Sequence, residues 1–200
     1  MSKRFLLTFA VVLAFALSAF AADEYNIDPV HSSANFSVTH MLISTVHGRF
    51  DKVTGTITYD PNDPSKCSVT AVIPVSSIDT DSQMRDNDLR SARFFEVDKY
   101  PEIRFQSASV RKVGDDKYIA TGSLTMKDST RQIELPFTVH TAVIHGQKKM
   151  GVEVEPIVLN RFDYDLSFDP TGATVGKDVT VQISLEADEV PTAKVVPAKK

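Results

Sequence analysis

The stretch SANFSVTH, residues 33–40, alternates apolar and polar side chains with a period of two. Ala34, Phe36 and Val38 fall on one face of such a segment, and polar residues fall on the other. Alternation of this kind is typical of a β-strand with one buried side and one solvent-facing side. The stretch therefore predicts a strand of an antiparallel sheet.

The same alternation recurs along most of the chain, and clusters of Gly, Pro, Asp and Asn separate the runs. The further runs are KVTGTITY (52–59), SVTAVIPV (68–75), IRFQSASV (103–110), KYIATGSLTM (117–126), QIELPFTVHTAVI (132–144), MGVEVEPIVL (150–159) and VTVQISLEA (179–187). Eight or so strands with short links predict an antiparallel meander. Such a meander either stacks into a sandwich or closes into a barrel, and periodicity alone does not choose between them.

The apolar face of these runs mixes large side chains with Gly55, Ala120 and Gly122. Small residues at such positions leave room for a bend or for a cavity. A barrel of about eight strands is just wide enough to be filled by side chains or to hold one small ligand. From the residues alone, a filled core is the favoured alternative.

The stretch QMRDNDLRSARFF, residues 83–95, interrupts the strand pattern and predicts a short polar helix. Thr80 and Gln83 have the spacing of a capping box, with Thr80 as the N-cap. The acid-first ion pairs predicted at i, i+4 spacing are Asp81–Arg85 and Asp86–Arg90. With few apolar positions, the helix is expected to lie across one end of the β-structure. Phe94 and Phe95 would pack at its exit.

The two ends of the chain predict segments outside the folded domain. Lys3 and Arg4, an apolar run and the A-x-A sequence at 19–21 are typical of a secretory signal peptide, cleaved after Ala21. A retained membrane anchor is the alternative, but the apolar run is short for a span. We therefore expect a mature protein without a transmembrane segment, in the periplasm. Residues 22–187 would form the domain, and 188–200 a disordered tail.

Composition excludes some classes of function. The formal net charge is −4 without a basic block, which argues against nucleic-acid binding. Cys67 is the single cysteine, so an internal disulfide is impossible. Its place on the apolar side of its run predicts a buried small residue rather than a reactive thiol.

Several longer motifs resemble those of the YceI-like family, the lipocalin-like polyisoprenoid-binding proteins. The segments that carry this resemblance are YNIDPVHSSANFSVTH (25–40), RDNDLRSARFF (85–95), YPEIRF (100–105) and TGSLTMKDST (121–130). The match runs from Tyr25 to about Ala187. Asp88 stands where the family usually has a histidine, which weakens any catalytic or ligand-binding reading of a histidine on this helix.

The resemblance implies an extended up-and-down antiparallel β-barrel with a short helix near its mouth. It implies non-catalytic binding of a long-chain isoprenoid or fatty-acyl lipid in an apolar tunnel, with no metal or redox cofactor. Handling of isoprenoids or envelope stress would be its physiological context, and edge-strand pairing would allow a homodimer. Strand parity and the resemblance together predict as ligand-binding residues Phe36, Val38, Phe50, Val53, Ile57, Val69, Ile73, Phe94, Phe105, Leu124 and Phe137, with Arg49 or Arg85 at the head group.

Two alternatives remain at the level of sequence. A hydrolase could use His31, His40 or His47 as a base, but the chain lacks a nucleophile-elbow motif and a phosphate-binding glycine loop. The spacing of these histidines also matches no common zinc pattern. The second alternative is a filled barrel that binds another envelope protein through its surface. A closed core would favour that protein, and a polar pocket with His and Asp would favour the enzyme.

Overall fold

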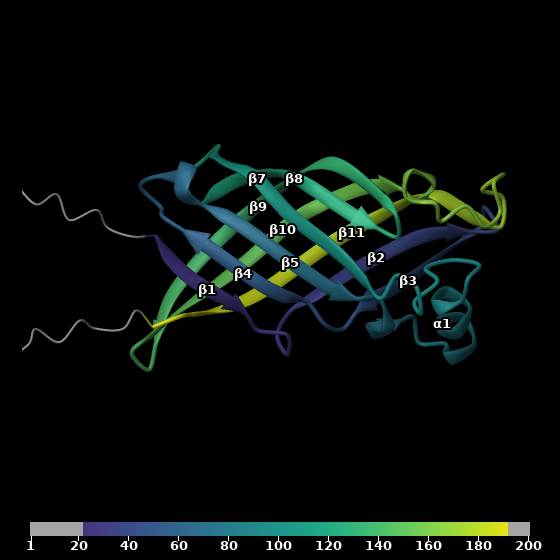
Figure 1. The fold of residues 1–200 in the computed structure, drawn as a ribbon, viewed down its shortest axis with the longest axis horizontal. Coiled ribbons are helices and arrows are strands. Elements are labelled where there is room, and N and C mark those ends of the chain that lie inside the picture. The colour runs from purple at the N-terminus through teal and green to yellow at the C-terminus, as the bar shows by residue number, and fades with distance from the viewer. Residues whose placement is uncertain (1–21, 192–200) are drawn as a thin grey trace, which may run out of the picture.

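The computed structural model describes residues 22–191, which form one antiparallel sheet closed into an elongated barrel (Figure 1). The strands are β1 (Asp23–Ile27), β2 (Ser33–His40), β3 (Ser44–Phe50), β4 (Thr54–Tyr59), β5 (Ser68–Pro74), β6 (Ile78–Asp79), β7 (Glu102–Lys112), β8 (Lys117–Met126), β9 (Ser129–Ile144), β10 (Gln147–Asn160) and β11 (Val175–Glu189). The helices in this range are α1 (Gln83–Arg90) and the 3₁₀ turns η1 (Pro64–Lys66), η2 (Val75–Ser77) and η3 (Arg161–Tyr164). The all-β class predicted from the alternation is confirmed.

The strand segments make a barrel of eight strands because three barrel strands are interrupted. β1 and β2 both pair with β11, one on each side of the loop 28–32. β3 and β4 form the next barrel strand, and β5 and β6 the one after it. Every barrel strand then neighbours the next one along the chain, and Tyr25 opposite Glu189 closes the ring. The up-and-down barrel implied by the resemblance is confirmed.

The last strand extends slightly beyond the predicted domain end. β11 runs to Glu189, and Asp188 lies opposite Asn26 of β1. Asp188 and Glu189, which the sequence placed in the tail, are therefore barrel residues. The predicted signal peptide at 1–21 and residues 192–200 of the predicted tail lie outside the described residues.

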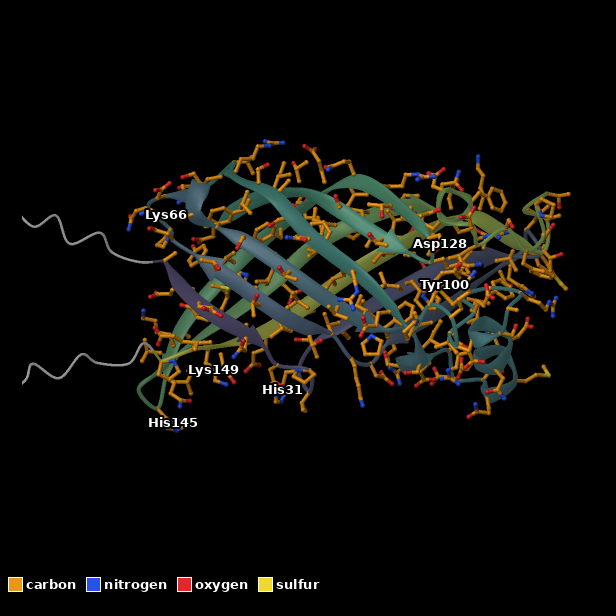
Figure 2. The ribbon with its side chains drawn as sticks, viewed as in Figure 1. His31, Lys66, Tyr100, Asp128, His145 and Lys149 are labelled. Carbon is orange, nitrogen blue, oxygen red and sulfur yellow. The ribbon has the colours of Figure 1, made fainter. Side chains whose placement is uncertain are left out.

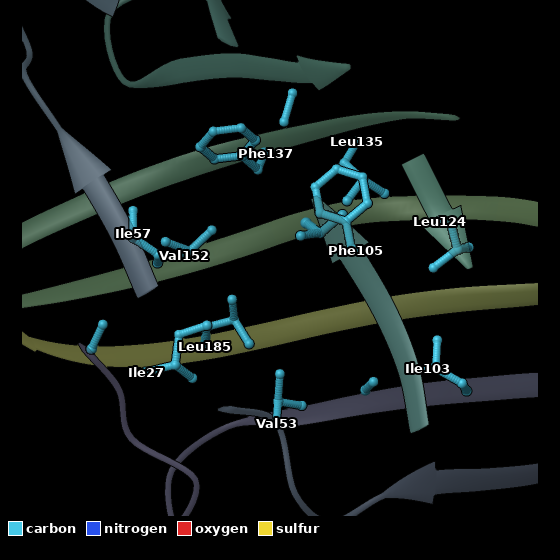
Figure 3. Packing of buried hydrophobic residues seen from close by; sticks show 14 of the residues in the cluster. Ile27, Val53, Ile57, Ile103, Phe105, Leu124, Leu135, Phe137, Val152 and Leu185 are labelled. Carbon is cyan, nitrogen blue, oxygen red and sulfur yellow. The ribbon is translucent and has the colours of Figure 1, made fainter. Parts of the chain in front are cut away.

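The interior of the barrel follows the alternation of the sequence. On β8, Tyr118, Ala120, Gly122 and Leu124 are buried while the residues between them are partly exposed. Figure 3 shows Phe105 of β7 and Leu135 and Phe137 of β9 pointing into the same interior space, although β8 separates the two strands in the sheet. The buried side chains join into one apolar cluster along the barrel. Burial of apolar surface in this cluster is the main stabilising contribution to the fold.

The glycines of the inner face serve close packing, which is one reason small residues occur there. A Cβ added to Gly122 would lie 2.7 Å from Cζ of Phe105, so the phenylalanine ring covers the glycine. A Cβ on Gly48 would lie 2.9 Å from Cε2 of Phe36 in the same way. Gly55 has a φ of +148°, a backbone conformation that residues other than glycine rarely adopt. It also lies so close to the backbone of β5 that a Cβ would collide with it.

The helix α1 lies at one end of the barrel, as predicted, but its local contacts differ from the prediction (Figure 1). It begins after Ser82, which makes no side-chain cap, so the predicted N-cap at Thr80 is wrong. Thr80 is buried and donates from its backbone N (2.9 Å) and hydroxyl (2.6 Å) to Oδ1 of Asp86. The reason is tertiary: β6 packs on the helix and brings Thr80 over its first turn.

The two predicted surface ion pairs of the helix do not form either. Arg85 donates from Nε to the hydroxyl of Thr80 at 2.8 Å, and Arg90 donates from Nη2 to the carbonyl of Ile78 at 2.6 Å. Arg90 therefore binds β6 and Arg85 binds the residue that follows it, instead of the acids along the helix. Within residues 22–191, no helix has the length and apolar content needed to cross a membrane.

Candidate functional site

The barrel encloses an apolar cavity of about 210 Å³. All eleven apolar residues predicted at the ligand line it, namely Phe36, Val38, Phe50, Val53, Ile57, Val69, Ile73, Phe94, Phe105, Leu124 and Phe137. Those on strands reach it because an even spacing along each strand keeps their side chains on the inner face, whereas Val53 and Phe94 reach it from the segments before β4 and after α1. Contact of these residues with a ligand stays a prediction. The filled core that the residues alone favoured is wrong, since space remains between the inner side chains.

Aromatic rings pack together at the end of the cavity that carries α1. The ring of Phe94 lies 5.0 Å from that of Phe168, and the guanidinium of Arg93 stacks 4.2 Å above the Phe168 ring. Phe95 makes an edge contact with Phe50 at 5.9 Å. Phe94 and Phe95 both line the cavity, so the predicted position of these two rings is confirmed.

A pair of tyrosines lies at the opposite end of the barrel. The hydroxyl oxygens of Tyr59 and Tyr118 are 3.0 Å apart, and the Tyr118 ring stacks on Phe137 at 5.6 Å. Burial and the bond to Tyr118 raise the pKa of Tyr59, which keeps its hydroxyl neutral. This end of the cavity is therefore polar at one point but uncharged.

Arg161 supplies the charge in the cavity, and sequence reasoning missed it. It follows β10 directly, is 5% exposed and is the one charged residue among the described residues that line the cavity. Its pKa is lowered because burial removes water from the guanidinium. In the sequence, an arginine between an apolar run and a turn gives no sign that it points inward.

Backbone carbonyls hold the guanidinium of Arg161. Nε donates to Gly176 at 2.9 Å, and Nη2 donates to Val175 at 2.8 Å and Asp169 at 3.1 Å. Nη1 donates to the carbonyl of Leu166. These bonds fold the segment between η3 and β11 around the side chain, at the same end of the barrel as α1.

The two arginines predicted at the head group lie elsewhere. Neither Arg49 nor Arg85 is among the described residues that line the cavity. Arg49 is bound by the carboxylates of Asp51 and Asp79, both at 2.6 Å, and Arg85 is bound to Thr80. Their side chains are therefore committed to Asp51 after β3, to Asp79 of β6 and to Thr80, which follows β6. Contact of either with a head group stays untested.

The histidines considered for catalysis do not meet in a cavity. Figure 2 shows His31 and Lys149 on the outside of the barrel. Nδ1 of His31 lies 2.7 Å from Asp28, and Glu186 completes a group whose side-chain atoms lie within 4.8 Å of one another. Lys149 lies 3.4 Å from Glu186 and so competes with any cation there. The pair with Asp28 raises the pKa of His31.

The cavity wall offers little chemistry beyond apolar contact. Among the described residues that line it, none is a histidine, serine or acid. Cys67 lines it, and burial raises the pKa of its thiol, which disfavours the nucleophilic thiolate. The buried position predicted for Cys67 is confirmed.

Comparisons with known proteins agree with this architecture. Residues 25–187 match the family model of the YceI-like domain. The chain is 37% identical over 185 residues to Protein YceI of Escherichia coli O17:K52:H18, covering 88% of this chain and 94% of that protein. The crystal structure of the Campylobacter jejuni YceI protein is 28% identical with a TM-score of 0.68, covering 76% of this chain and 90% of that one.

A second solved structure shows the same fold at lower identity. It is a polyisoprenoid binding domain from Saccharophagus degradans implicated in plant cell wall breakdown, with 17% identity and a TM-score of 0.67. The alignment covers 83% of this chain and 98% of that domain. The barrel, the matched family model and the identity to the curated relative lead to one conclusion. The chain belongs to the YceI-like domain family.

Proposed function

We propose that this protein binds and carries a long-chain hydrophobic lipid, a polyisoprenoid or a fatty-acyl lipid, inside its barrel. The observation that carries the proposal is the apolar cavity, with aromatic rings packed at its α1 end. An apolar site of this kind binds its ligand through buried hydrocarbon area. The family relative described as a polyisoprenoid binding domain supports the same class of ligand.

The energetics of such a site favour long chains. Each methylene group that leaves water contributes about 0.8 kcal/mol. Ten of them give roughly 8 kcal/mol, which association costs of about 4–15 kcal/mol largely cancel. Short chains should therefore bind weakly, and long chains should bind well.

The proposal includes a compartment and the absence of catalysis. The pattern at residues 1–21 supports export through a cleaved signal peptide, which would place the carrier in the periplasm. There it would take part in isoprenoid handling or in the response to envelope stress. An apolar wall without a histidine, serine or acid among its described residues, with burial disfavouring the thiolate of Cys67, supports binding without turnover.

Native mass spectrometry of the protein purified from its own envelope tests the proposal. The expected result is a chain that starts at Ala22 and carries one long-chain lipid, identified after organic extraction. A ligand-free mass that does not shift after incubation with polyprenyl and fatty-acyl lipids would refute lipid carriage. A full-length mass in the membrane fraction would refute the compartment separately.

A further inference from the structure

The buried charge of Arg161 lacks an anionic partner. Within residues 22–191, no carboxylate oxygen lies within the 4.0 Å of a salt bridge from its guanidinium. The compensation comes from the ring of Phe162, whose centroid lies 4.4 Å away, from the carbonyl dipoles that accept its hydrogen bonds and, beyond salt-bridge distance, from the Asp169 carboxylate. A buried charge is costly unless it is paired, so a charge kept at this place needs an explanation.

The hydrogen bonds of Arg161 also leave one donor over. A guanidinium has five N–H groups, two of them on Nη1. Four carbonyls accept from Arg161, and Nη1 has one of these partners, the carbonyl of Leu166. The carbonyl contacts explain how the turn is held, but they supply no anion and leave the fifth donor without a partner among the described residues.

The position of Arg161 suits the polar end of a bound lipid. The segment that follows Arg161 contacts the residues after α1, because the ring of Phe168 packs on that of Phe94. The charge therefore lies at the end of the cavity where these aromatic rings pack. The opposite end holds the neutral pair of Tyr59 and Tyr118. An anionic head at Arg161 would therefore direct the tail along the apolar wall toward the tyrosines.

We propose that Arg161 binds the anionic head group of the lipid, a carboxylate or a phosphate, through its unpaired charge and its remaining Nη1 donor. The inference rests on the proposed lipid-carrier function and names the head group that the carrier selects. Guanidinium bonds to carboxylate or phosphate are the strong, charge-assisted kind. A neutral alcohol of the same chain length would leave the charge unpaired.

Binding of three lipids with the same tail tests this proposal. Hexadecanoic acid, hexadecyl phosphate and hexadecanol are titrated into the delipidated full mature protein, and dissociation constants are measured by calorimetry or probe displacement. We expect at least one of the two anionic lipids to bind tenfold or more tightly than the alcohol. Comparing the acid with the phosphate shows which anion the site prefers.

Variants of Arg161 assign the preference to this residue. Arg161→Met should remove the preference for the anion while leaving alcohol affinity within about threefold, and Arg161→Lys should keep part of it. Arg111→Met, on the outer wall of β7, is the matched control and should change neither the preference for the anion nor the affinity for the alcohol. If Arg161→Met does not fold, the proposal is still tested by two measurements. They are the ratio of anion to alcohol affinity in the wild type and the part of that ratio that Arg161→Lys keeps.

The outcomes separate this inference from the function on which it rests. Equal binding of acid, phosphate and alcohol, or an anion preference that survives in Arg161→Met, would overturn the role of Arg161 and leave lipid carriage intact. Failure of all three lipids to bind, together with failure of polyprenyl lipids, would overturn the carrier itself.

Discussion

Filling one end of the cavity should shorten the lipid tail that the barrel accepts. Ala120 on β8 is buried, lines the cavity and lies two residues from Tyr118 at the tyrosine end. In Ala120→Phe the added ring would occupy part of the cavity that Ala120 lines. Thr121→Phe adds the same bulk on the partly exposed outer side of the strand and serves as the control.

The length of the cavity gives the magnitude. Tyr118 and Met126 line it near its two ends, eight residues apart on β8. At about 3.3 Å per residue and a tilt of about 40°, they lie about 20 Å apart along the barrel axis. Carbon–carbon bonds of about 1.5 Å at about 111° advance about 1.25 Å each, so roughly 16 methylenes span the cavity.

The variant loses the part of this path beyond Ala120. Two residues correspond to about 5 Å along the axis, or roughly four methylenes. At about 0.8 kcal/mol each, a tail of full length loses about 3 kcal/mol, which is roughly 100-fold in dissociation constant. Tails of about 12 methylenes or fewer should bind almost as they do to the wild type.

A chain-length series of fatty acids measures the effect. The affinity of the wild type should rise with length and level off near 16 methylenes, and that of Ala120→Phe should level off near 12. Thr121→Phe should follow the wild type. A plateau at the same length in wild type and Ala120→Phe, with both proteins folded by circular dichroism, would refute the placement of the tail in this cavity.

Three further predictions concern the mouth and the turns. Phe94→Ala removes a ring that closes the cavity, so stopped-flow release of bound lipid should speed up about tenfold or more, and an unchanged rate would contradict the closing role. Hydrogen bonds to Thr171 and Thr174 lower the pKa of Asp169 to about 2. The stability that its carboxylate adds is therefore full above pH 4 and is lost as the pH falls toward 2. Thermal melts should show Asp169→Asn less stable than the wild type at pH 6 but not at pH 2. Met41 and Leu42 have left-handed backbone conformations in a turn closed by the hydrogen bond from Ile43 N to His40 O. Replacing them with Asn–Gly should raise the unfolding free energy by about 1–2 kcal/mol in denaturant melts. A lower unfolding free energy would show that the two side chains stabilise the turn.

The wall of the cavity was predictable because it depends on a local rule. Once SANFSVTH is a strand, its period places Phe36 and Val38 on one side, and the same rule applies to Phe105 and Leu124. Sequence alone left the choice between a sandwich and a barrel open, since closure depends on the pairing of Tyr25 with Glu189 at opposite ends of the chain. The family resemblance supplied that choice.

The polar groups were not predictable in the same way, because their partners are distant in the chain. Thr80 has the sequence pattern of an N-cap, but a strand brings it over Asp86, and the buried contact replaces the local one. Arg161 gives no periodic signal, and its acceptors come from a turn that must fold back first. Helix patterns could therefore identify α1 without identifying what its charged residues bind.

The two ends of the cavity differ in a way that gives a bound lipid a direction. At the α1 end, Arg161 is charged and short of an anion, and the rings of Phe94 and Phe168 lie beside its turn. At the other end, the hydroxyls of Tyr59 and Tyr118 bond to each other, and burial raises the pKa of Tyr59. An uncharged hydrocarbon tail leaves the tyrosine pair intact, whereas an anionic head there would meet no compensating charge. A lipid with an anionic head is therefore expected to enter tail first at the α1 end and to leave head first by the same end, past Phe94.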